Sequence, residues 1–525
     1  MPLIADFFGQ NLLFMLRFLF LITCISITHL GFSQDPLKEN LAPCGTPAGI
    51  SPWLRSYAAN PGSQMAVRTE DTLWVALQVH LLAKNNASGR FPYDKVLDAF
   101  CRLNADYAPS NIQFYLYNPF NLINSTEWYA HATIPQGIDM MLTNNVAGAL
   151  NTYFVSDPAG NCGYNIPYGG VALGHGCAAA SDHTWAHEAG HALSLPHPFI
   201  GWEGKTYNYN TQTPSVLTYD YTYFHDSVEI QVPAPLDTAL VELVDGSNCS
   251  IAADLICDSK ADYLSYRWNC NSQNQSSVKQ KDPNGIDFYS DGTLFMSYAD
   301  DACQSRFTPE EIGAMRFNLM TEKSSWVAPA VPVLPVEGLA VAKEPLPDHP
   351  EPVTGVKLVW ASVPNASHYL VQASRFSNFA VREVDVITSD TSILTGQLLL
   401  NKTYHWRVKA FNLWHACTDF NTPSTFLTVP LSAAHVPDSE GWRCYPSLLS
   451  AGQSLKMEIP ERWLGKEAVL RILDVAGSIV WSTDMKLDHV DTTLKLPSDT
   501  WAGGLYHLVL SSPSGTKHQS IVFMK

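Results

Sequence analysis

Short runs in which apolar and polar residues alternate fill the chain between residues 337 and 432. Successive side chains of a β-strand point to opposite faces of a sheet, so this alternation predicts strands with one buried face. Val356, Leu358 and Trp360 form one such run, and residues 403–408 form another. The pattern therefore predicts an all-β sandwich over 337–432.

A second all-β sandwich is expected over residues 440–525. Residues 471–481 read as a hairpin with Gly477 in its turn, and residues 502–525 read as two final strands. Repeated prolines in 326–336 predict a linker before the first sandwich. Residues 68–325 are expected to form one larger domain.

The most informative segment is residues 187–197, HEAGHALSLPH. Positions four apart lie one above the other on one face of an α-helix, so His187 and His191 would present two imidazoles to a single point. The residues between them favour a helix, and Pro196 marks its end. His197 lies beyond that end, where a turn would bring a third imidazole to the same point.

These residue types point to a catalytic zinc ion. Three neutral imidazoles from His187, His191 and His197 leave a fourth coordination position open for water, which separates a catalytic zinc site from a closed structural one. Glu188 follows the first ligand and can reach that water as a general base. The segment therefore predicts a hydrolase with one zinc ion.

The segment resembles the zinc signature of the metzincin metalloproteases, HEXXHXXGXXH. On that resemblance His187, His191 and His197 bind zinc and Glu188 is the catalytic base. Ser194 stands where the family has Gly, at a position whose backbone needs a positive φ. A Ser in that conformation costs on the order of 1 kcal/mol.

Further segments resemble the pappalysin branch of the metzincins, from about residue 69 to residue 320. They are the zinc segment with the GWEG that follows it, residues 248–262 (NCSIAADLICDSKAD) and residues 295–308 (FMSYADDACQSRFT). The resemblance implies an α+β metzincin catalytic domain with a mixed twisted sheet, an active-site helix and a Met-turn at Met296. It also implies that Tyr298 hydrogen-bonds the oxyanion during peptide hydrolysis.

The same resemblance has implications for substrate and calcium binding. Residues 169–173 lie where metzincins have an edge strand that pairs with an extended substrate. Asp301 is at a position where an acidic pappalysin residue lines the pocket for the residue after the cut, which implies a preference for Arg or Lys there. Asp254 and Asp258 lie in a segment that carries a structural Ca²⁺ in some pappalysins. All three carboxylates could equally be solvated loop residues.

Cysteine usage predicts disulfides, because one of the 11 cysteines lies in the first 33 residues and an even number remains. The expected pairs are, from the resemblance, Cys249–Cys270 and Cys257–Cys303 and, from spacing, Cys162–Cys177 and Cys417–Cys444.

Cys44 and Cys101 leave two interpretations open. They form a fifth disulfide, or Cys44, in APCGTP, acts like the Cys-Gly segment of metzincin propeptides, where a thiolate fills the open zinc position and keeps the zymogen silent. In the second case residues 34–67 form a pro-segment, and cleavage before Arg68 would release it.

The two ends of the chain indicate export. Residues 1–33 contain an apolar run with Arg17 and end in small residues, which is typical of a signal peptide. Residues 337–432 resemble a fibronectin type III domain. Residues 440–525 resemble the C-terminal sorting domain of the bacterial type IX secretion system, which implies that machinery as a partner and a location outside the cell or on its surface. No later run is long enough to span a bilayer.

Charge excludes some partners. The 525 residues include 32 basic and 49 acidic ones, which gives a net charge of −17. The sequence has no cluster of basic residues that would predict binding to nucleic acid or to anionic membranes. The expected function is a secreted zinc endopeptidase acting on proteins or peptides. The alternative is a cell-surface protein that binds through its β modules on an inactive protease scaffold, and the intact Glu188 argues against it.

Overall fold

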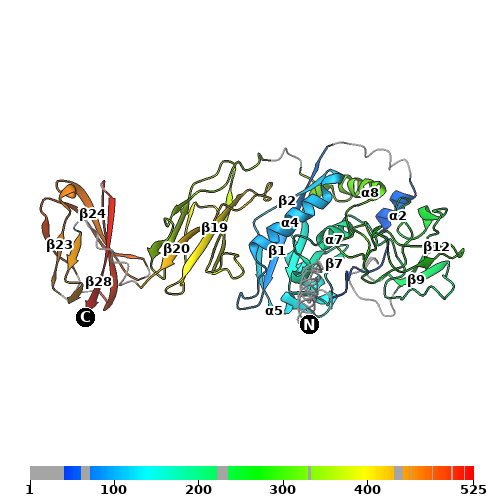
Figure 1. Cartoon of the computed structure of the whole chain (residues 1–525), viewed down its shortest axis with the longest axis horizontal. Coiled ribbons are helices and arrows are strands. Elements are labelled where there is room, and N and C mark those ends of the chain that lie inside the picture. Colours follow the sequence, from blue (N-terminus) through cyan, green and yellow to red (C-terminus); the bar gives the residue numbers. More distant parts are fainter. Residues whose placement is uncertain are drawn as a thin grey trace, which may run out of the picture. The chain divides into compact units, whose positions relative to one another are not determined.

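The computed structural model describes residues 41–60, 71–221, 235–328, 333–430, 442–450, 452–475, 477–497, 501–513 and 515–524 (Figure 1). The predicted signal peptide and the predicted cleavage site before Arg68 lie outside these residues. The chain forms two compact units. The first comprises residues 1–349, 356–396 and 403–426, and the second comprises residues 350–355, 397–402 and 427–525.

A mixed β-sheet forms the centre of the N-terminal part of the first unit. Its strand order is β2-β1-β5-β8-β7, and β3 also pairs with β1. All neighbours run parallel except β7, which is antiparallel to β8. The longest strand, β1, has the sequence LWVALQVHLLA and is buried over most of its length, as expected for a parallel strand covered on both faces. The bounds are β1 (Leu73–Ala83), β2 (Ile112–Leu116), β3 (Asn121–Asn124), β5 (Leu150–Val155), β7 (Gly163–Ile166) and β8 (Gly170–Gly174).

One edge of this sheet is β7. Residues 169–173 fall largely within β8, which lies inside the sheet between β5 and β7. The prediction that 169–173 form the edge strand was therefore wrong. The chain turns back between Ile166 and Gly170, where the two strands pair, so the preceding strand takes the edge position. β7 also packs beside helix α7 (Thr184–Ala192).

Helices cover the sheet and close the site. The longest, α4 (Tyr93–Tyr107), packs against β2 and α7, and its buried apolar side chains join those of β1 and α7 in one core. A capping box of Thr308 and Glu311, with Pro309 at the first position, starts α8 (Pro309–Met320). The remaining helices are α2 (Pro52–Ala58), α5 (Thr126–Tyr129) and α6 (Ile134–Asn144).

The described residues between α7 and α8 (193–221 and 235–308) have little regular structure. Two small hairpins and short 3₁₀ turns alternate with loops, and this stretch is stapled by disulfides. The hairpins of this part are formed by β9 (Val216–Asp220) with β10 (Leu236–Leu240) and by β11 (Gln280–Lys281) with β12 (Asp287–Phe288). Earlier in the chain, β4 (Ala130–His131) and β6 (Asp157–Pro158) form another two-stranded sheet.

The described cysteines form four disulfides, which are Cys101–Cys417, Cys162–Cys177, Cys249–Cys257 and Cys270–Cys303. Cys162–Cys177 is one of the two pairs that spacing predicted. The predicted pairs Cys249–Cys270, Cys257–Cys303 and Cys417–Cys444 were wrong, because Cys249 pairs with Cys257, Cys270 with Cys303 and Cys101 with Cys417. Of the two interpretations left open for Cys44, the disulfide with Cys101 is contradicted, because Cys44, like Cys444, is free and buried.

The tertiary contacts explain the observed pairing. A short 3₁₀ turn brings the Cα atoms of Cys249 and Cys257 within 5.0 Å. Trp268 bridges to Ala299 through backbone hydrogen bonds, which places Cys270 beside Cys303. Disulfides of this number are compatible with an oxidising, extracellular compartment.

Two further groups of strands follow. The first is built of a three-stranded sheet, β13-β15-β18, and a five-stranded sheet, β14-β20-β19-β16-β17, around buried side chains such as Trp360 and Trp406. The strands are β13 (Ala342–Glu344), β14 (His349–Glu351), β15 (Lys357–Trp360), β16 (His368–Ser374), β17 (Val384–Thr388), β18 (Ser392–Leu394), β19 (Thr403–Phe411) and β20 (Ser424–Thr428).

The last part of the second unit has its own core around Trp463 and Leu470. Its sheets have the orders β21-β23-β26 and β22-β28-β27-β24-β25. The strands are β21 (Arg443–Tyr445), β22 (Leu448–Ser450), β23 (Ser454–Glu458), β24 (Glu467–Leu473), β25 (Ile479–Lys486), β26 (Asp491–Lys495), β27 (Gly504–Ser512) and β28 (Gly515–Met524).

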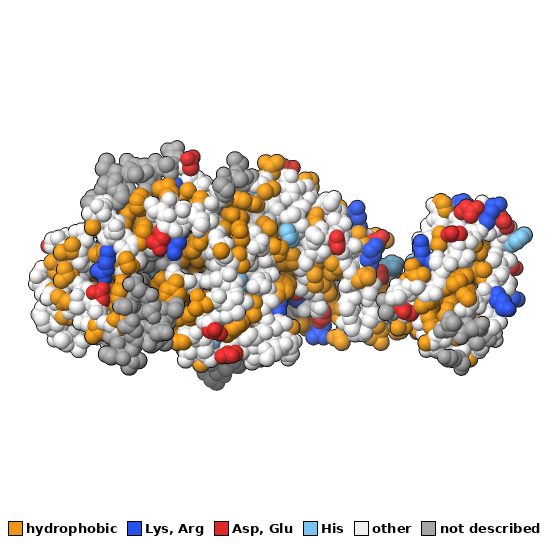
Figure 2. Space-filling model, turned by 180° about the vertical axis from the view of Figure 1, so that it is seen from behind, with side chains coloured by type: hydrophobic (Ala, Val, Ile, Leu, Met, Phe, Trp, Pro, Cys, Tyr) orange, Lys and Arg blue, Asp and Glu red, His pale blue; other side chains and the backbone are white. Residues whose placement is uncertain are grey.

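The surface carries charges of both signs. On the face shown in Figure 2, acidic and basic side chains are scattered among hydrophobic and uncharged ones. None of the helices in the described ranges is long and apolar enough to cross a membrane.

Candidate metal centre

Helix α7 holds the first two histidines. His187 and His191 lie four residues apart on one face, and both are buried. On another face Gly190 lies against Met296, where a Cβ would stand only 2.5 Å from the Met296 Sδ. Glycine therefore allows the helix to sit directly on the methionine, and this contact fixes the depth of the two imidazoles.

A sharp turn ends the helix and returns the chain toward His197. Ser194 adopts φ 74°, the left-handed conformation that the sequence pattern required. Its amide donates to His191 O at 2.9 Å, and the Leu195 amide donates to Gly190 O at 3.0 Å. The side chain of Asn318, from α8, donates to Ser194 Oγ at 3.2 Å. These bonds hold a strained residue in the conformation that brings the third histidine back.

The three imidazoles converge on one point. His191 Nε2 lies 3.0 Å from His187 Nε2 and 3.1 Å from His197 Nε2. Burial lowers the pKa of His187 to about 4 and the pKa values of His191 and His197 well below the usual range, so all three are neutral. Neutral imidazoles are the form that binds a metal.

Each imidazole is oriented through its other nitrogen. His187 Nδ1 donates to Phe295 O at 2.7 Å, and His191 Nδ1 donates to Leu195 O at 2.7 Å. His197 Nδ1 donates to the Glu203 carboxylate at 3.1 Å. The proton of each ring is therefore on Nδ1, and three bare Nε2 lone pairs face one another. Such an arrangement is repulsive unless a cation lies among them, so the donor set fits a zinc ion.

Glu188 is fully buried beside this point. Its Oε2 accepts a hydrogen bond from Thr46 Oγ1 at 2.8 Å. Burial raises the pKa of Glu188 to about 8. A carboxyl whose pKa lies near neutrality is suited to take up and release a proton.

Residues 295–298, in the loop that precedes α8, pack against the histidines and α7. Phe295 supplies the carbonyl that orients His187, and Met296 packs beneath the helix. The ring of Tyr298 lies 4.9 Å from that of His197, and its hydroxyl donates to Cys44 O at 3.2 Å. The predicted Met-turn residues are therefore beside the histidines.

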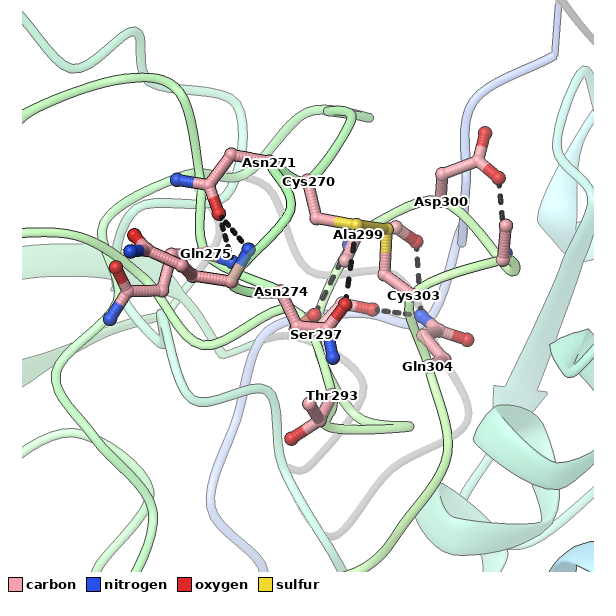
Figure 3. Close-up of a disulfide and its surroundings, with 12 residues drawn as sticks. Cys270, Asn271, Asn274, Gln275, Thr293, Ser297, Ala299, Asp300, Cys303 and Gln304 are labelled. Atoms are coloured by element: carbon pink, nitrogen blue, oxygen red, sulfur yellow. Dashed lines mark hydrogen bonds between the residues drawn. A yellow bond between two sulfur atoms is a disulfide. The ribbon is translucent and has the colours of Figure 1, made fainter.

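This loop is held rigidly in turn. Figure 3 shows the Cys270–Cys303 disulfide beside Gln304, whose Nε2 donates to the carbonyls of Ser297 at 3.0 Å and Ala299 at 3.1 Å. The disulfide and the amide together fix the backbone on both sides of Tyr298.

An N-terminal segment around Cys44 covers the centre. Cys44 Sγ lies 3.7 Å from His191 Nε2, and together with the three histidines it forms a set of four ligand atoms within 4.8 Å of one another. Burial, followed by the charge of Glu188, raises the pKa of the Cys44 thiol well above its usual value. The segment also pairs with the sheet edge, because the Gly45 amide donates to Gly163 O at 2.8 Å.

Asp301 lies at the start of α7. Its Oδ1 accepts a hydrogen bond from the His183 amide at 2.8 Å. It lines a small cavity, of about 20 Å³, together with Pro43, His187 and Arg267. The predicted pocket residue is thus beside the first histidine, and a guanidinium lines the same cavity.

The candidate calcium residues lie away from this centre. Asp254 is buried and accepts hydrogen bonds from the Ile256 amide and Ser259 Oγ, and Asp258 accepts one from the Glu310 amide. Burial raises the pKa of Asp254 to about 7. Among the described residues, the Cys44 and histidine set is the one cluster of three or more such ligand groups, so a calcium site stays a prediction.

Two functional contacts were not predicted from the sequence. Thr46 and Glu203 touch the centre directly, and both lie in segments that had been noticed, APCGTP and GWEG. Neither residue type has a spacing rule that would mark it, so only the fold reveals them.

Comparison with known proteins supports a peptidase. A family model described as Peptidase M66 matches residues 141–228, which include α7 and all three histidines. The match indicates a metallopeptidase. No curated protein matches the chain.

Solved structures with partial likeness include fibronectin modules. They include the chicken CNTN1 FN1-FN3 domains (14% identity, 36% of this chain and 67% of that chain, TM-score 0.15). The fibronectin(III)-like modules of Clostridium thermocellum CbhA (10% identity, 35% and 93%, TM-score 0.15) and FN3tt (13% identity, 18% and 98%, TM-score 0.14) are similar in part as well. TM-scores this low carry no argument about this chain.

Proposed function

We propose that the chain is a secreted zinc endopeptidase of the pappalysin type, made in a latent form. The observation that carries the proposal is the convergence of three proton-free Nε2 atoms, each oriented through Nδ1, beside a buried glutamate. His187, His191 and His197 would hold one zinc ion, which supplies Lewis-acid polarisation of a water molecule and of the substrate carbonyl when bound.

The chain's own residues perform the remaining chemistry. Glu188 accepts a proton from the attacking water and passes it to the leaving nitrogen as the peptide bond breaks. The Tyr298 hydroxyl, which now donates to the Cys44 carbonyl, donates to the substrate carbonyl oxygen as it gains charge. Once the N-terminal segment has left, the edge of β7 provides backbone groups for an extended peptide.

Latency follows from the contacts of Cys44. Its sulfur lies at the open side of the histidine cluster, and neighbouring residues of the same segment occupy both the sheet edge and Glu188. A substrate cannot enter while this segment is in place. Removal of the predicted pro-segment, residues 34–67, would open the site.

Asp301 is proposed to line the pocket for the residue after the cut, with a preference for Arg or Lys. Its place beside His187 supports that role, whereas Arg267 in the same cavity opposes it. In a peptide library, Asp301→Asn should weaken and Arg267→Gln should strengthen the preference for basic residues. An apolar preference that neither variant changes would exclude the pocket role.

The remaining assignments rest on the sequence resemblances. We propose export through a signal peptide and the type IX secretion machinery, a fibronectin type III-like module, and a structural Ca²⁺ near Asp254 and Asp258. Calorimetric titration of the full chain with Ca²⁺, in the wild type and in Asp254→Asn, tests the calcium site.

The decisive experiment measures hydrolysis of denatured protein substrates together with zinc content. The full chain, after its N-terminal segment is cleaved, should bind one zinc per chain and cut substrates, and chelator should abolish cutting. Glu188→Gln should retain zinc and fold but lose activity by several orders of magnitude. A cleaved wild type that binds zinc yet never cuts peptides would favour a binding protein on a protease scaffold.

A further inference from the structure

The Glu203 carboxylate accepts two hydrogen bonds, one from the ring of His197 and one from the backbone of the turn that follows it. Its Oε1 accepts from His197 Nδ1 at 3.1 Å, and its Oε2 accepts from the Gly201 amide at 2.7 Å. The carboxylate therefore ties the ring of His197 to the backbone of the turn that follows it.

This turn is built to fold Glu203 back onto His197. The Ile200 amide donates to His197 O, and Gly201 adopts φ 90°. The Lys205 ammonium donates to Gly201 O at 2.7 Å, so the turn is fastened from its other side. The conformation of the turn thus fixes where the carboxylate stands.

His197 depends on this contact more than the other two histidines depend on theirs. His187 and His191 are held in α7, and their Nδ1 atoms meet backbone carbonyls, which carry no net charge. His197 lies outside the helix, and its Nδ1 meets a carboxylate. A carboxylate acceptor makes the opposite nitrogen a stronger donor to a metal and fixes the ring orientation.

We propose that Glu203 is the positioning residue of the third ligand and sets the zinc affinity of the centre. This inference rests on the proposed zinc site and deepens it. The carboxylate charge, rather than the mere filling of space, supplies part of the affinity, since a charged acceptor at Nδ1 makes Nε2 a stronger donor to the metal. Losses of about 10- to 100-fold in metal affinity are typical when such a partner is removed.

The test compares Glu203→Ala and Glu203→Gln with Glu322→Gln in the full chain. Glu203 and Glu322 both line a second cavity, of about 60 Å³, beside His191 and His197. Glu322 is exposed and pairs with Lys323, whereas Glu203 bonds His197, so Glu322 is a matched charge control. Zinc affinity is measured by competition with a chromophoric chelator, and the visible spectrum of the cobalt(II) form reports ligand geometry.

Glu203→Ala should lower zinc affinity by about 10- to 100-fold and shift the cobalt spectrum, Glu203→Gln should lower it by about 10-fold, and Glu322→Gln should stay within twofold of the wild type. If Glu203→Ala fails to fold, the near-isosteric Glu203→Gln decides. Wild-type affinity and an unchanged spectrum in Glu203→Gln would overturn the inference whatever Glu203→Ala does, because the charge would then contribute nothing. A wild type that binds no zinc would instead overturn the proposed function.

Discussion

The Thr46 hydroxyl donates to Glu188 Oε2 at 2.8 Å and accepts from the Asn165 amide at 2.7 Å. One side chain of the N-terminal segment therefore engages the proposed catalytic base and an amide of the edge strand β7 together. A substrate would need both groups. Thr46 and substrate would thus compete for the same contacts, and this competition does not depend on whether the Cys44 sulfur lies at the histidines.

The first prediction follows from this competition. Thr46→Val keeps the size of the side chain but removes the hydroxyl, so the segment should leave the site more readily. If the hydrogen bond contributes about 1.4 kcal/mol to the binding of the segment, close to the lower end of the range for a bond to a carboxylate, its loss raises the initial peptidase rate of the uncleaved chain about tenfold. The measurement is the hydrolysis of a quenched fluorescent peptide before any N-terminal cleavage is seen by mass spectrometry.

Ser51→Ala is the control for that experiment. It removes the cap of α2, where Ser51 Oγ accepts from the Leu54 amide, and so loosens the same segment away from the base. If Ser51→Ala activates the chain as strongly as Thr46→Val, the contact with Glu188 has no special part in latency.

The convergence of the three histidines could be predicted from the sequence because its geometry is local. Helical spacing alone places His187 and His191 together, and the expectation of a positive φ at Ser194 came from the Gly that the metzincin signature has there. Met296 was found because its segment resembles a known turn. Each of these inferences uses only a few neighbouring positions.

The second prediction concerns the contact between Gly190 and Met296. A Cβ on Gly190 would lie 2.5 Å from Met296 Sδ, and Met296 is fully buried, so Gly190→Ala must displace the sulfur or the helix. We expect it to lower the free energy of unfolding by about 1–3 kcal/mol, as overpacking does. Urea unfolding of the full chain, monitored by Trp fluorescence, provides the measurement.

Gly313→Ala is the matched control, because Gly313 is also helical and a Cβ there meets only Tyr57 Oη at 3.5 Å. That variant should raise the free energy of unfolding by about 0.4–1 kcal/mol through the lower entropy of the unfolded chain. Equal stability of the two variants would show that the Met296 contact carries no strain.

The contacts that could not be predicted join distant parts of the chain. Cys101 pairs with Cys417 across 316 residues, and Cys270 pairs with Cys303 because two loops lie side by side. Neither distance can be read from spacing. The edge position of β7 likewise depends on a tight reversal before Gly170, and the contact of Thr46 with Glu188 spans 142 residues.

The third prediction concerns Ser194, which has a φ of 74°. Glycine adopts such a positive φ at little cost in free energy. Ser194→Gly should raise the free energy of unfolding by up to about 1 kcal/mol, reduced by the loss of the Asn318 hydrogen bond. Ser194→Val should lower it and reduce zinc content, because a β-branched residue resists this conformation and His197 would be displaced. Thermal unfolding and metal analysis of both variants check this, and a stable, zinc-loaded Ser194→Val would contradict it.

The fourth prediction is a pH dependence of stability that arises away from the metal centre. Burial, followed by the charge of Asp254, raises the pKa of Glu242 to about 9 from a usual value of 4.5. Between these two pH values the folded chain binds more protons at Glu242 than the unfolded chain does. Stability from this group is therefore full below about pH 4.5 and is lost as pH rises toward 9.

Glu242→Gln removes the titrating group but keeps a polar side chain of similar size. Relative to the wild type, it should gain stability steadily between pH 5 and pH 9, since only the wild type must ionise a buried carboxyl. Urea unfolding of both proteins at a series of pH values measures this difference. Glu322→Gln, which alters an exposed glutamate, should run parallel to the wild type. If the Glu242→Gln curve also runs parallel to the wild type, Glu242 ionises as readily in the folded chain as in the unfolded one.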